Sequence, residues 1–308
     1  MNIDFNELKH FIAVVDYGSF TKAAKNIYVS QSTISKSINK LEKKLKVELL
    51  ERSTRKVIVT DAGELVYKQG IKILGATKEL DILISDFMNL PTGDIKIGVP
   101  PLIGTLFFAN IAQYFGKLNP GITLELVEWG AKRVESLVEE GQIDVGLVVL
   151  PVNNDKFNVL PFVEDEFMLF THKKHPLANE KIIKIEDLRE EDFILFTDEF
   201  SLHGLVIDHC KRSGFDPKIA YKSSQWDLIT ELIIAELGVT LFPKSAYSRM
   251  DKDKVSVIPI QSPPTWELAV ITKKDSYHSF AVRSLLRFFR EDFNVYYDDN
   301  IFYFTFSD

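Results

Sequence analysis

Apolar residues near the start of the chain recur every three or four positions between residues 8 and 15. This spacing predicts a helix, and Gly18 is a natural place for the helix to end. Asp4 and Glu7 have the spacing of a capping box, in which two side chains bind the free backbone N–H groups at a helix start. We therefore expect the chain to begin with a capped helix.

Two further helices and a hairpin are predicted next. Ser19 and Ser30 each precede a helical stretch, so both are expected to act as N-caps. The third helix carries an apolar stripe made of Ile34, Ile38, Leu41 and Leu45. Residues 49–52 and 57–60 flank a polar turn at 53–56, which predicts a two-stranded hairpin. Three helices followed by a basic hairpin are typical of a winged helix-turn-helix.

A long helix is expected from Thr60 to about Met88, before Pro91 and Gly93 interrupt it. Its apolar positions alternate at spacings of four and three, which is typical of a seam that pairs with a partner helix. The residues expected to pair are Val66, Ile73, Ala76, Leu80, Leu83 and Phe87, with Gln69 as the polar member. The alternative is a helix that packs only on its own domain.

From Asp94 onward, strand-like alternation and helical spacing take turns, with short connections between them. This order predicts an α/β architecture in which helices cover mostly parallel sheets. Strands are expected at 94–99, 122–129, 143–150, 166–171, 193–196, 218–223, 238–242 and 266–272. Helices are expected at 102–118, 131–140, 202–213, 225–237 and 277–293. Two such sets imply a two-lobed body.

The pattern divides the chain into a small head and a larger body. The expected boundaries are 3–60 for the winged helix-turn-helix, 61–90 for a dimerisation linker helix, 91–293 for a regulatory domain and 294–308 for an aromatic tail. The last predicted helix can return the chain to the first lobe. Lobe I is therefore expected to comprise about 91–160 and 265–293, and lobe II about 161–264.

Charge is distributed unevenly between these parts. The 308 residues carry a net charge of −7, but residues 1–60 hold 11 Lys+Arg against 6 Asp+Glu, hence +5. The remainder holds 26 against 38, hence −12. A basic head supplies the local positive potential that binding to nucleic-acid phosphates needs. The overall content of 45% hydrophobic and 26% charged residues excludes a disordered, collagen-like or disulfide-stapled chain.

Targeting signals are not evident in the sequence. The first sixteen residues contain three acidic side chains and no basic region before an apolar core, so a signal peptide is not expected. No apolar run reaches the roughly 18 residues of a membrane span. Cys210 is the only cysteine, which excludes an internal disulfide and fits a reducing compartment. A cytoplasmic protein without membrane contact is therefore expected.

The polar face of the third helix suits the major groove of B-DNA, which admits a helix and displays a pattern of donors and acceptors. The candidate contacts on this helix are Ser30, Gln31, Ser32, Thr33, Ser35, Lys36, Asn39 and Lys40. Lys22 on the second helix and Arg52, Arg55 and Lys56 on the wing suit phosphates. Taken alone, a lysine-rich helix face is also typical of solvated surface. The linked helices, wing and basic charge favour DNA.

The same segment resembles the DNA-binding domain of LysR-type transcriptional regulators. The resemblance is carried by Gly18-Ser19-Phe20, Ala23-Ala24, Val29-Ser30-Gln31, Leu49-Leu50-Glu51-Arg52 and Thr60-Asp61-Ala62-Gly63. Ser32 stands where the family often has Pro, and Leu50 where it often has Phe. His175-Pro176-Leu177-Ala178 and Leu237-Gly238-Val239 are similar to the family's effector domain, which has the fold of periplasmic solute-binding proteins.

The resemblance implies a transcriptional regulator without catalysis and without a cofactor. Its implied partners are a pseudo-palindromic operator in double-stranded DNA, a small-molecule effector, further copies of the chain in a dimer and a tetramer, and RNA polymerase. Effector closure of the lobes would change how dimers assemble and how the DNA bends. Effector identity, operator, and activation or repression are not set by this sequence.

In a two-lobed sensor the effector lies between the lobes, where loops at strand ends supply its contacts. The positions at those ends are Pro100, Pro101, Leu102, Thr105, Trp129, Gly130, Val149, Thr197, Ser201, His203 and Ser224. The family often has Ser or Thr at the first of these. Pro100-Pro101 removes two N–H donors, which disfavours a tightly bound carboxylate at that end.

Other chemistry has weak support. His172 and His175 lack the further ligands of a metal site, and Cys210 is more typical of a buried hydrophobe than of a reactive thiol beside His209. Hydrolase, metalloprotease and nucleotide-binding motifs do not occur. Two alternatives remain: a two-lobed enzyme or binding protein whose head serves only oligomerisation, and a regulator without an effector, its cleft filled by Trp129 and neighbouring side chains.

Overall fold

The structure is a computed structural model of the 308-residue chain, and it describes residues 3–51, 57–87, 92–298 and 301–306. The described chain forms two compact units. The first comprises residues 1–90 and 140–142, and the second comprises residues 91–139 and 143–308.

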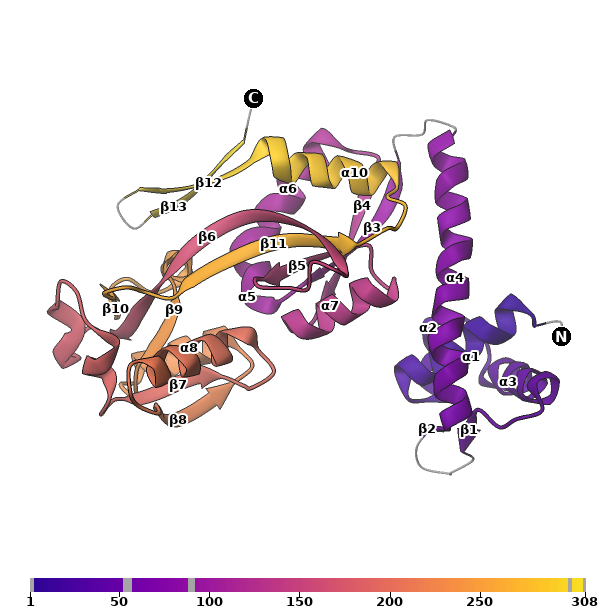
Figure 1. The fold of residues 1–308 in the computed structure, drawn as a ribbon, viewed down its shortest axis with the longest axis horizontal. Helices are drawn as coiled ribbons and strands as arrows, with labels where there is room; N and C mark the ends of the chain where they lie inside the picture. The colour runs from indigo at the N-terminus through magenta and orange to yellow at the C-terminus, as the bar shows by residue number, and fades with distance from the viewer. Residues whose placement is uncertain (1–2, 52–56, 88–91, 299–300, 307–308) are drawn as a thin grey trace. The chain divides into compact units, whose positions relative to one another are not determined.

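The first unit is a winged helix-turn-helix followed by one long helix (Figure 1). Its elements are α1 (Phe5–Tyr17), α2 (Phe20–Asn26), α3 (Gln31–Leu45), β1 (Leu50–Glu51), β2 (Ile58–Val59) and α4 (Asp61–Phe87). The core between α1, α2 and α3 contains Phe11, Val14, Ile34 and Leu41, all fully buried. Removing these side chains from water supplies the main driving force for docking the three helices.

The start of α1 differs from the predicted capping box. The Asp4 carboxylate caps the helix by accepting a hydrogen bond from the Asn6 amide at 2.8 Å. Glu7 instead turns toward α3, where it is buried and pairs with the Lys44 ammonium at 2.8 Å. The prediction was wrong because a tertiary partner competes with the local one, and a buried carboxylate requires a charged partner.

The two halves of α4 have different environments. In its first half Ile71 is buried against the winged-helix core, and Val66 packs against the same cluster. A Cβ atom at Gly70 would lie 2.9 Å from Leu8, so glycine permits the close approach of α4 to α1. Val66, a predicted seam residue, is therefore partly covered by its own domain. Farther along, Leu80, Leu83 and Ile84 are between 43% and 58% exposed.

Lobe I of the second unit is an open sheet between two helical layers. Its elements are β3 (Gly93–Val99), α5 (Pro101–Ile103), a π-helical turn η1 (Gly104–Phe108), α6 (Ala109–Leu118), β4 (Ile122–Glu128), α7 (Ala131–Glu140), β5 (Val145–Val149), α10 (Phe280–Arg287) and the turn η5 (Phe288–Asp292). Strand β3 runs parallel to β4 and β5. Phe107 and Phe115 pack on one face of the sheet, and Val134 and Val138 of α7 pack on the other.

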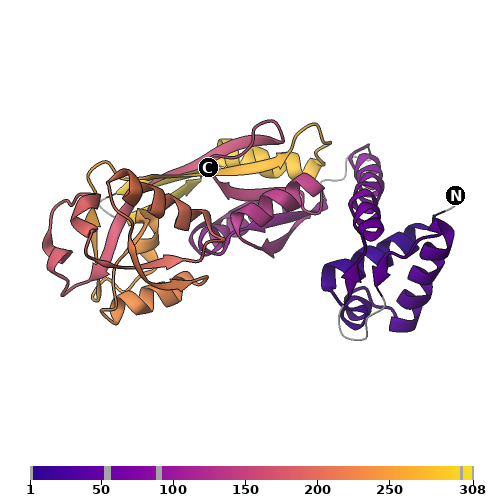
Figure 2. The same cartoon turned by 60° about the horizontal axis from the view of Figure 1, so that its bottom comes forward.

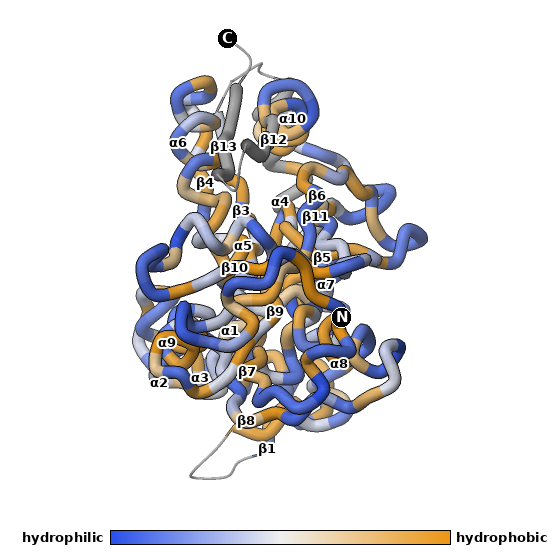
Figure 3. Tube along the Cα trace, turned by 90° about the vertical axis from the view of Figure 1, so that its left-hand side faces the viewer, coloured by the Kyte–Doolittle hydropathy of each residue, from blue (hydrophilic) through white to orange (hydrophobic). Residues whose placement is uncertain are grey.

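Lobe II is built around two small groups of strands. Its elements are the turns η2 (Pro176–Asn179) and η3 (Ile185–Leu188), β7 (Asp192–Phe196), α8 (Ser201–Arg212), β8 (Lys218–Ser223), α9 (Trp226–Ile234), β9 (Thr240–Pro243), η4 (Lys244–Arg249) and β10 (Val255–Pro259). Strands β7 and β8 pair in parallel. The hydrophobic colour of β7 and β9 in Figure 3 matches their burial in the core.

Two long strands join the lobes. Strands β6 (Phe157–His172) and β11 (Thr265–Lys273) run antiparallel and side by side through the second unit (Figures 1 and 2). The last five residues of β6 pair with β10, and β9 pairs with β6 as well. Only residues 166–171 of β6 are predicted as a strand from the sequence. The main sheet is consequently mixed, and the expectation of mostly parallel pairing is wrong.

The aromatic tail folds into a hairpin of β12 (Phe293–Asp298) and β13 (Ile301–Phe306). Phe293 is buried among Phe162 of β6 and Phe288 and Phe289 of η5. Strand β12 lies against β6, and β13 lies against η4 of lobe II. The hairpin therefore starts from lobe I and reaches lobe II, an arrangement that the sequence pattern did not predict.

Candidate functional site: a DNA-reading helix and an interlobe pocket

Helix α3 presents one apolar and one polar face. Ile34, Ile38 and Leu41 are at most 2% exposed and hold the helix against α1. The predicted DNA contacts lie on the other side: Gln31, Ser32, Thr33, Lys36 and Lys40 are exposed, and Ser35 and Asn39 are half-buried. The amphipathic spacing thus leaves side-chain donors and acceptors facing solvent along one helix face, as base readout requires.

Hydroxyl groups organise the N-terminus of α3. The Ser30 Oγ accepts a hydrogen bond from the Thr33 amide at 3.1 Å, which caps the helix. The same Oγ lies 2.8 Å from the hydroxyls of Ser32 and Thr33. Ser30 thus acts mainly as the cap of the helix, and its neighbours are pre-ordered at the end that carries the positive helix dipole.

The base of the wing is fixed by a buried carboxylate and by the hydroxyl of a half-buried threonine. The Glu42 carboxylate, on α3, accepts hydrogen bonds from the amides of Leu49 at 2.8 Å and Leu50 at 3.3 Å. Thr60 Oγ1 caps α4 by accepting from the Gly63 amide and donates to the Glu48 carbonyl. The predicted contacts Arg52, Arg55 and Lys56 lie outside the described residues.

Two further exposed side chains flank α3. Lys22 lies on α2 and is exposed, in keeping with its predicted place at a phosphate. Tyr28 occupies the turn between α2 and α3 with a positive φ of 56° and is 96% exposed. Tyr28 is not among the DNA contacts predicted from the sequence. A bulky aromatic side chain in a left-handed conformation with no covering group is unfavourable in isolation, and such positions cluster at functional sites.

The predicted effector positions of each lobe come together at a sheet edge. Val99 of β3 lies opposite Glu128 of β4, so the loops that begin at Pro100 and Trp129 leave the same edge. In lobe II, Phe196 of β7 lies opposite Ser223 of β8, and the Thr197 amide donates to the Ser223 carbonyl at 3.1 Å.

The two lobes approach each other closely at these edges. A Cβ atom at Gly130 of lobe I would lie 3.6 Å from the Glu199 carbonyl oxygen of lobe II. Trp129, beside it, is 56% exposed, so its indole does not fill an interlobe space. Any effector bound at this edge must therefore fit into a narrow gap between the two lobes.

Several predicted side chains are engaged within their own lobe. Leu102 and Val149 are buried in the hydrophobic core, and Pro100 is buried as well. The Thr105 hydroxyl donates to the Pro101 carbonyl of its own helical turn at 3.1 Å. In lobe II, Ser224 is exposed, whereas the neighbouring Ser223 is buried and accepts from the Gln225 amide. Ser201, the first residue of α8, is half-buried.

His203 holds the loop before α8. Its Nδ1 lies 2.8 Å from the Phe196 carbonyl oxygen, and its Nε2 lies 3.2 Å from the Asp198 carboxylate. Lys222 reaches the same carboxylate at 2.7 Å, and this hydrogen bond is the main reason that the pKa of Asp198 is below its ordinary value. Because both ring nitrogens face protein partners, His203 positions the loop.

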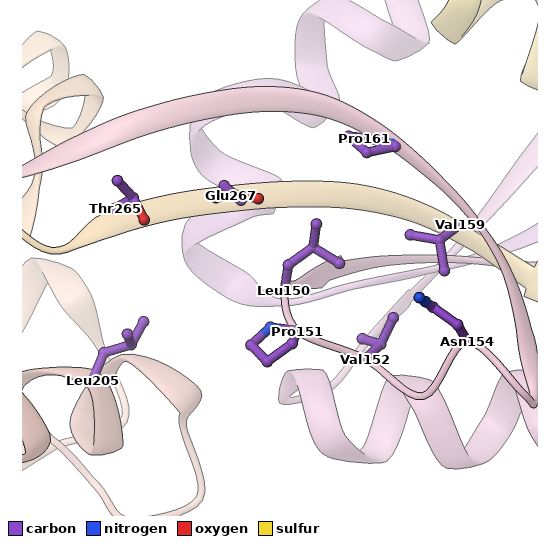
Figure 4. A pocket seen from close by; sticks show the side chains of 9 residues that line it. All are labelled: Leu150, Pro151, Val152, Asn154, Val159, Pro161, Leu205, Thr265 and Glu267. Carbon is purple, nitrogen blue, oxygen red and sulfur yellow. The ribbon is translucent and has the colours of Figure 1, made fainter.

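A pocket of about 570 Å³ lies beside the crossing strands, between lobe I and α8. Leu205 comes from α8 on one side, and the loop after β5 provides Leu150 and Pro151 on the other (Figure 4). The complete lining is Leu150, Pro151, Val152, Asn154, Val159, Pro161, Leu205, Thr265 and Glu267. None of these nine was predicted as an effector contact. The predicted positions nearest to this lining are Val149, which precedes Leu150 along the chain, and His203, which lies on α8 together with Leu205.

Cys210 and the neighbouring His209 are shaped by their burial. Cys210 is fully buried in the core, and burial raises the pKa of its thiol to about 12. Burial, followed by the charge of Arg212, lowers the pKa of the adjacent His209. Among the described residues, no three His, Cys, Asp or Glu side chains are grouped as a metal site would require. No helix within those residues is long and apolar enough to span a membrane.

Each of the two units matches a known protein family. The bacterial regulatory helix-turn-helix family of lysR type matches residues 5–64, and the LysR substrate binding domain matches residues 89–294. The hairpin strand β13 lies beyond the second match.

Individual relatives cover nearly the whole chain. The HTH-type transcriptional regulator YwbI of Bacillus subtilis (strain 168) is 41% identical over 92% of this chain and 95% of that protein. A hydrogen peroxide-inducible genes activator of Pectobacterium carotovorum is 27% identical over 90% of this chain and 91% of its own length. Full-length OxyR from Pseudomonas aeruginosa, at 22% identity, shares the fold with a TM-score of 0.74 over 94% of this chain and 95% of that one.

Proposed function

The chain belongs to the LysR family of transcriptional regulators, and on that premise we propose how its residues bind DNA, a partner copy and an effector. It is a DNA-binding regulator with an effector-binding domain. The family consists of regulators and not of enzymes, so the alternative of a two-lobed enzyme with an oligomerising head is set aside.

Helix α3 is proposed to enter the major groove of a pseudo-palindromic operator. The observation that carries this proposal is the exposed row of Gln31, Ser32, Thr33 and Lys36 on a helix whose other face is buried. Gln and Ser side chains suit base edges, and Lys36 suits a base or a phosphate. Tyr28 is added to the predicted set because its hydroxyl, at the exposed turn before α3, suits a backbone phosphate.

Dimerisation is proposed to use the exposed apolar side chains of α4 from Ile73 onward. Ile73, Leu80, Leu83 and Ile84 are between 38% and 58% exposed, and Ala76 is exposed between them. Spacings of three and four place these residues on one side of the helix, where a second copy would cover them. Two paired helices would present two α3 helices to the two half-sites, and a tetramer would form from two such dimers.

The effector is proposed to bind between the lobes of the second unit, in the pocket beside β6 and β11. Its volume of about 570 Å³ falls in the range of small-molecule sites. Because Leu205 belongs to lobe II and Leu150 to lobe I, a ligand that contacts both favours one separation of the lobes. The half-exposed Trp129 argues against the alternative of a cleft that is filled by its own side chains.

Hydrogen peroxide, the inducer in the name of the Pectobacterium relative, does not suit this chain as an effector that acts through a thiol. Thiol oxidation needs an accessible thiolate. The only cysteine, Cys210, is fully buried, and its pKa of about 12 keeps it protonated at neutral pH. A non-covalent ligand fits the pocket better.

The DNA-binding proposal is tested by footprinting the purified protein on genomic DNA from its source at two salt concentrations. We expect discrete protected sites with a dyad, each spanning two half-sites about one helical turn apart or a multiple of it. Diffuse binding that disappears at the higher salt concentration would contradict operator recognition, since nonspecific binding is mostly electrostatic.

A further inference from the structure

The charge of the pocket lining restricts the ligand. Glu267 is the only charged side chain among the nine lining residues, and Asn154 and Thr265 are the only other polar ones. The remaining lining is aliphatic or proline. A carboxylate or phosphate ligand would therefore meet a like charge and find no lysine or arginine in this lining to bind it.

Two more carboxylates share the face of the crossing strands that carries Glu267. Glu164 of β6 lies directly opposite Glu267, and Glu166 lies opposite Thr265. All three glutamates are exposed, and among the described residues none of them forms an ion pair with a lysine, arginine or histidine. Like charges that face each other across two strands are destabilising, so a bound cation would relieve this repulsion.

Basic side chains near the pocket loop are already engaged. The Lys274 ammonium binds the Asn154 carbonyl oxygen at 3.1 Å, and Lys156 pairs with Glu139 at 2.9 Å. Glu199, which precedes α8 and is exposed, adds negative charge on the lobe II side. At the lobe I sheet edge, Pro100 and Pro101 provide no N–H groups for an anion.

We infer that the effector is an organic cation, an amine with an apolar body, whose ammonium group binds Glu267 while its body contacts Leu150, Pro151 and Leu205. This inference rests on the proposed function of the pocket as the effector site. The charge of −12 outside the first sixty residues acts in the same direction, since an acidic body attracts cations and repels anions.

The test uses the full-length protein and three probes of similar shape. The probes are 2-phenylethylamine, the uncharged 2-phenylethanol and the anionic 3-phenylpropanoate, each titrated to millimolar concentration by calorimetry and ligand-observed NMR. We expect the amine to bind at least about tenfold more tightly than the carboxylate, with an affinity that falls as salt rises.

Three variants test whether the amine binds in this pocket and through Glu267. Glu267→Gln should weaken amine binding about tenfold and leave the alcohol unchanged, because only the charged hydrogen bond is lost. Glu231→Gln, an exposed site on α9, removes the same charge elsewhere and should change neither. Leu205→Trp fills the pocket and should abolish binding of the amine; its folding is checked by thermal unfolding.

The outcomes test the chemical class of the ligand and the location of its site independently. If the carboxylate binds more tightly than the amine and Leu205→Trp abolishes this binding, the inference of a cationic effector is overturned and the pocket is retained as the site. Binding that is unaffected by Leu205→Trp would overturn the pocket itself. Failure of the amine to bind wild-type protein at millimolar concentration, or an amine affinity unchanged by Glu267→Gln, would overturn the inference about Glu267.

Discussion

The two units of this protein build their binding surfaces in different ways. In the winged helix, the proposed DNA contacts between Gln31 and Lys40 lie on one face of one helix, α3. In the sensor unit, the pocket takes its lining from four segments, the loop after β5, the strands β6 and β11, and α8. One surface is fixed by local helix geometry, whereas the other exists only when the two lobes are assembled.

This difference has a consequence for function. The face of α3 is supported by Ile34 and Leu41 beneath it, so single substitutions of exposed residues there should change DNA binding without changing the fold. The pocket is lined by both lobes, so substitutions of its side chains should change both ligand affinity and the position of the lobes.

The largest expected effect concerns α4, whose first half belongs to the winged-helix core. Ile73→Glu combined with Leu80→Glu should weaken the dimer by at least about a thousandfold, because unpaired charges would be buried in the partner interface. Analytical ultracentrifugation at micromolar protein measures the loss. A variant that still sediments like the parent would contradict the proposed interface.

Val66→Glu provides the matched control on the same helix. Val66 packs on the winged-helix core, so this charge should lower the free energy of unfolding of the first unit and not act first on the dimer. An equal loss of dimer without destabilisation would place Val66 on the seam after all.

The next largest effect concerns the base of the wing. Glu42→Ala leaves the amides of Leu49 and Leu50 without their buried carboxylate acceptor, which costs about 2–3 kcal/mol of unfolding free energy. Urea unfolding of the first unit, followed by circular dichroism, measures this change. Glu48→Ala, an exposed neighbour, is the control and should cost less than about 0.5 kcal/mol. Equal stability of the two variants would show that the wing does not depend on Glu42.

A smaller effect is expected for the reading face itself. Lys36→Ala should weaken operator binding about tenfold and reduce the salt slope by about 1, with no change in thermal stability. Lys72→Ala, exposed on α4, removes the same charge from the same unit and should leave specific binding unchanged. If both variants bind alike in a gel-shift titration, the contribution of Lys36 is only nonspecific attraction.

The smallest effect is a pH dependence within the sensor unit. Burial lowers the pKa of His278, Arg283 lowers it further, and the Lys273 carbonyl opposes them. The folded state therefore binds the proton less well than the unfolded state. The stabilising contribution is present above the ordinary pKa of 6.5 and is lost as pH falls through the lower, folded value.

His278→Gln removes this dependence. Because the ring is only partly buried, the difference between the two proteins should be small, and it should appear only below about pH 6.5. Urea unfolding at pH 7.5 and pH 5.5 measures it. A steeper pH dependence in the variant would contradict the assigned direction of the shift.

Much of the first unit was predictable because its structure depends on neighbours along the chain. Ser19 and Ser30 are caps as predicted, and Gly18 ends α1 in a left-handed conformation with φ of 58°. The exception is Glu7, which does not form the predicted capping box and instead pairs with Lys44, 37 residues away. Local signals failed here because a buried charge selects its partner in space.

The second unit was predictable at the level of its helices and less so at its crossing strands. Residues 157–165 of β6 were not predicted as a strand, since Pro161 and the acidic residues interrupt the pattern. The pocket residues Thr265 and Glu267 alternate with the buried Trp266, and nothing in that alternation indicates which face borders a cavity. The pocket forms only where Leu205 of α8 and the loop after β5 are placed beside this face.

The sequence by itself determined the family, the order of the elements, and the helix whose polar face is proposed to read DNA. These depend on periodicity, capping and motifs, which act over a few residues. The tertiary structure decided which half of α4 remains exposed, where the interlobe pocket lies, and that Glu164 and Glu267 face each other across two strands. Those features arise from contacts between segments distant in sequence, whose geometry is set by the packing of the whole unit.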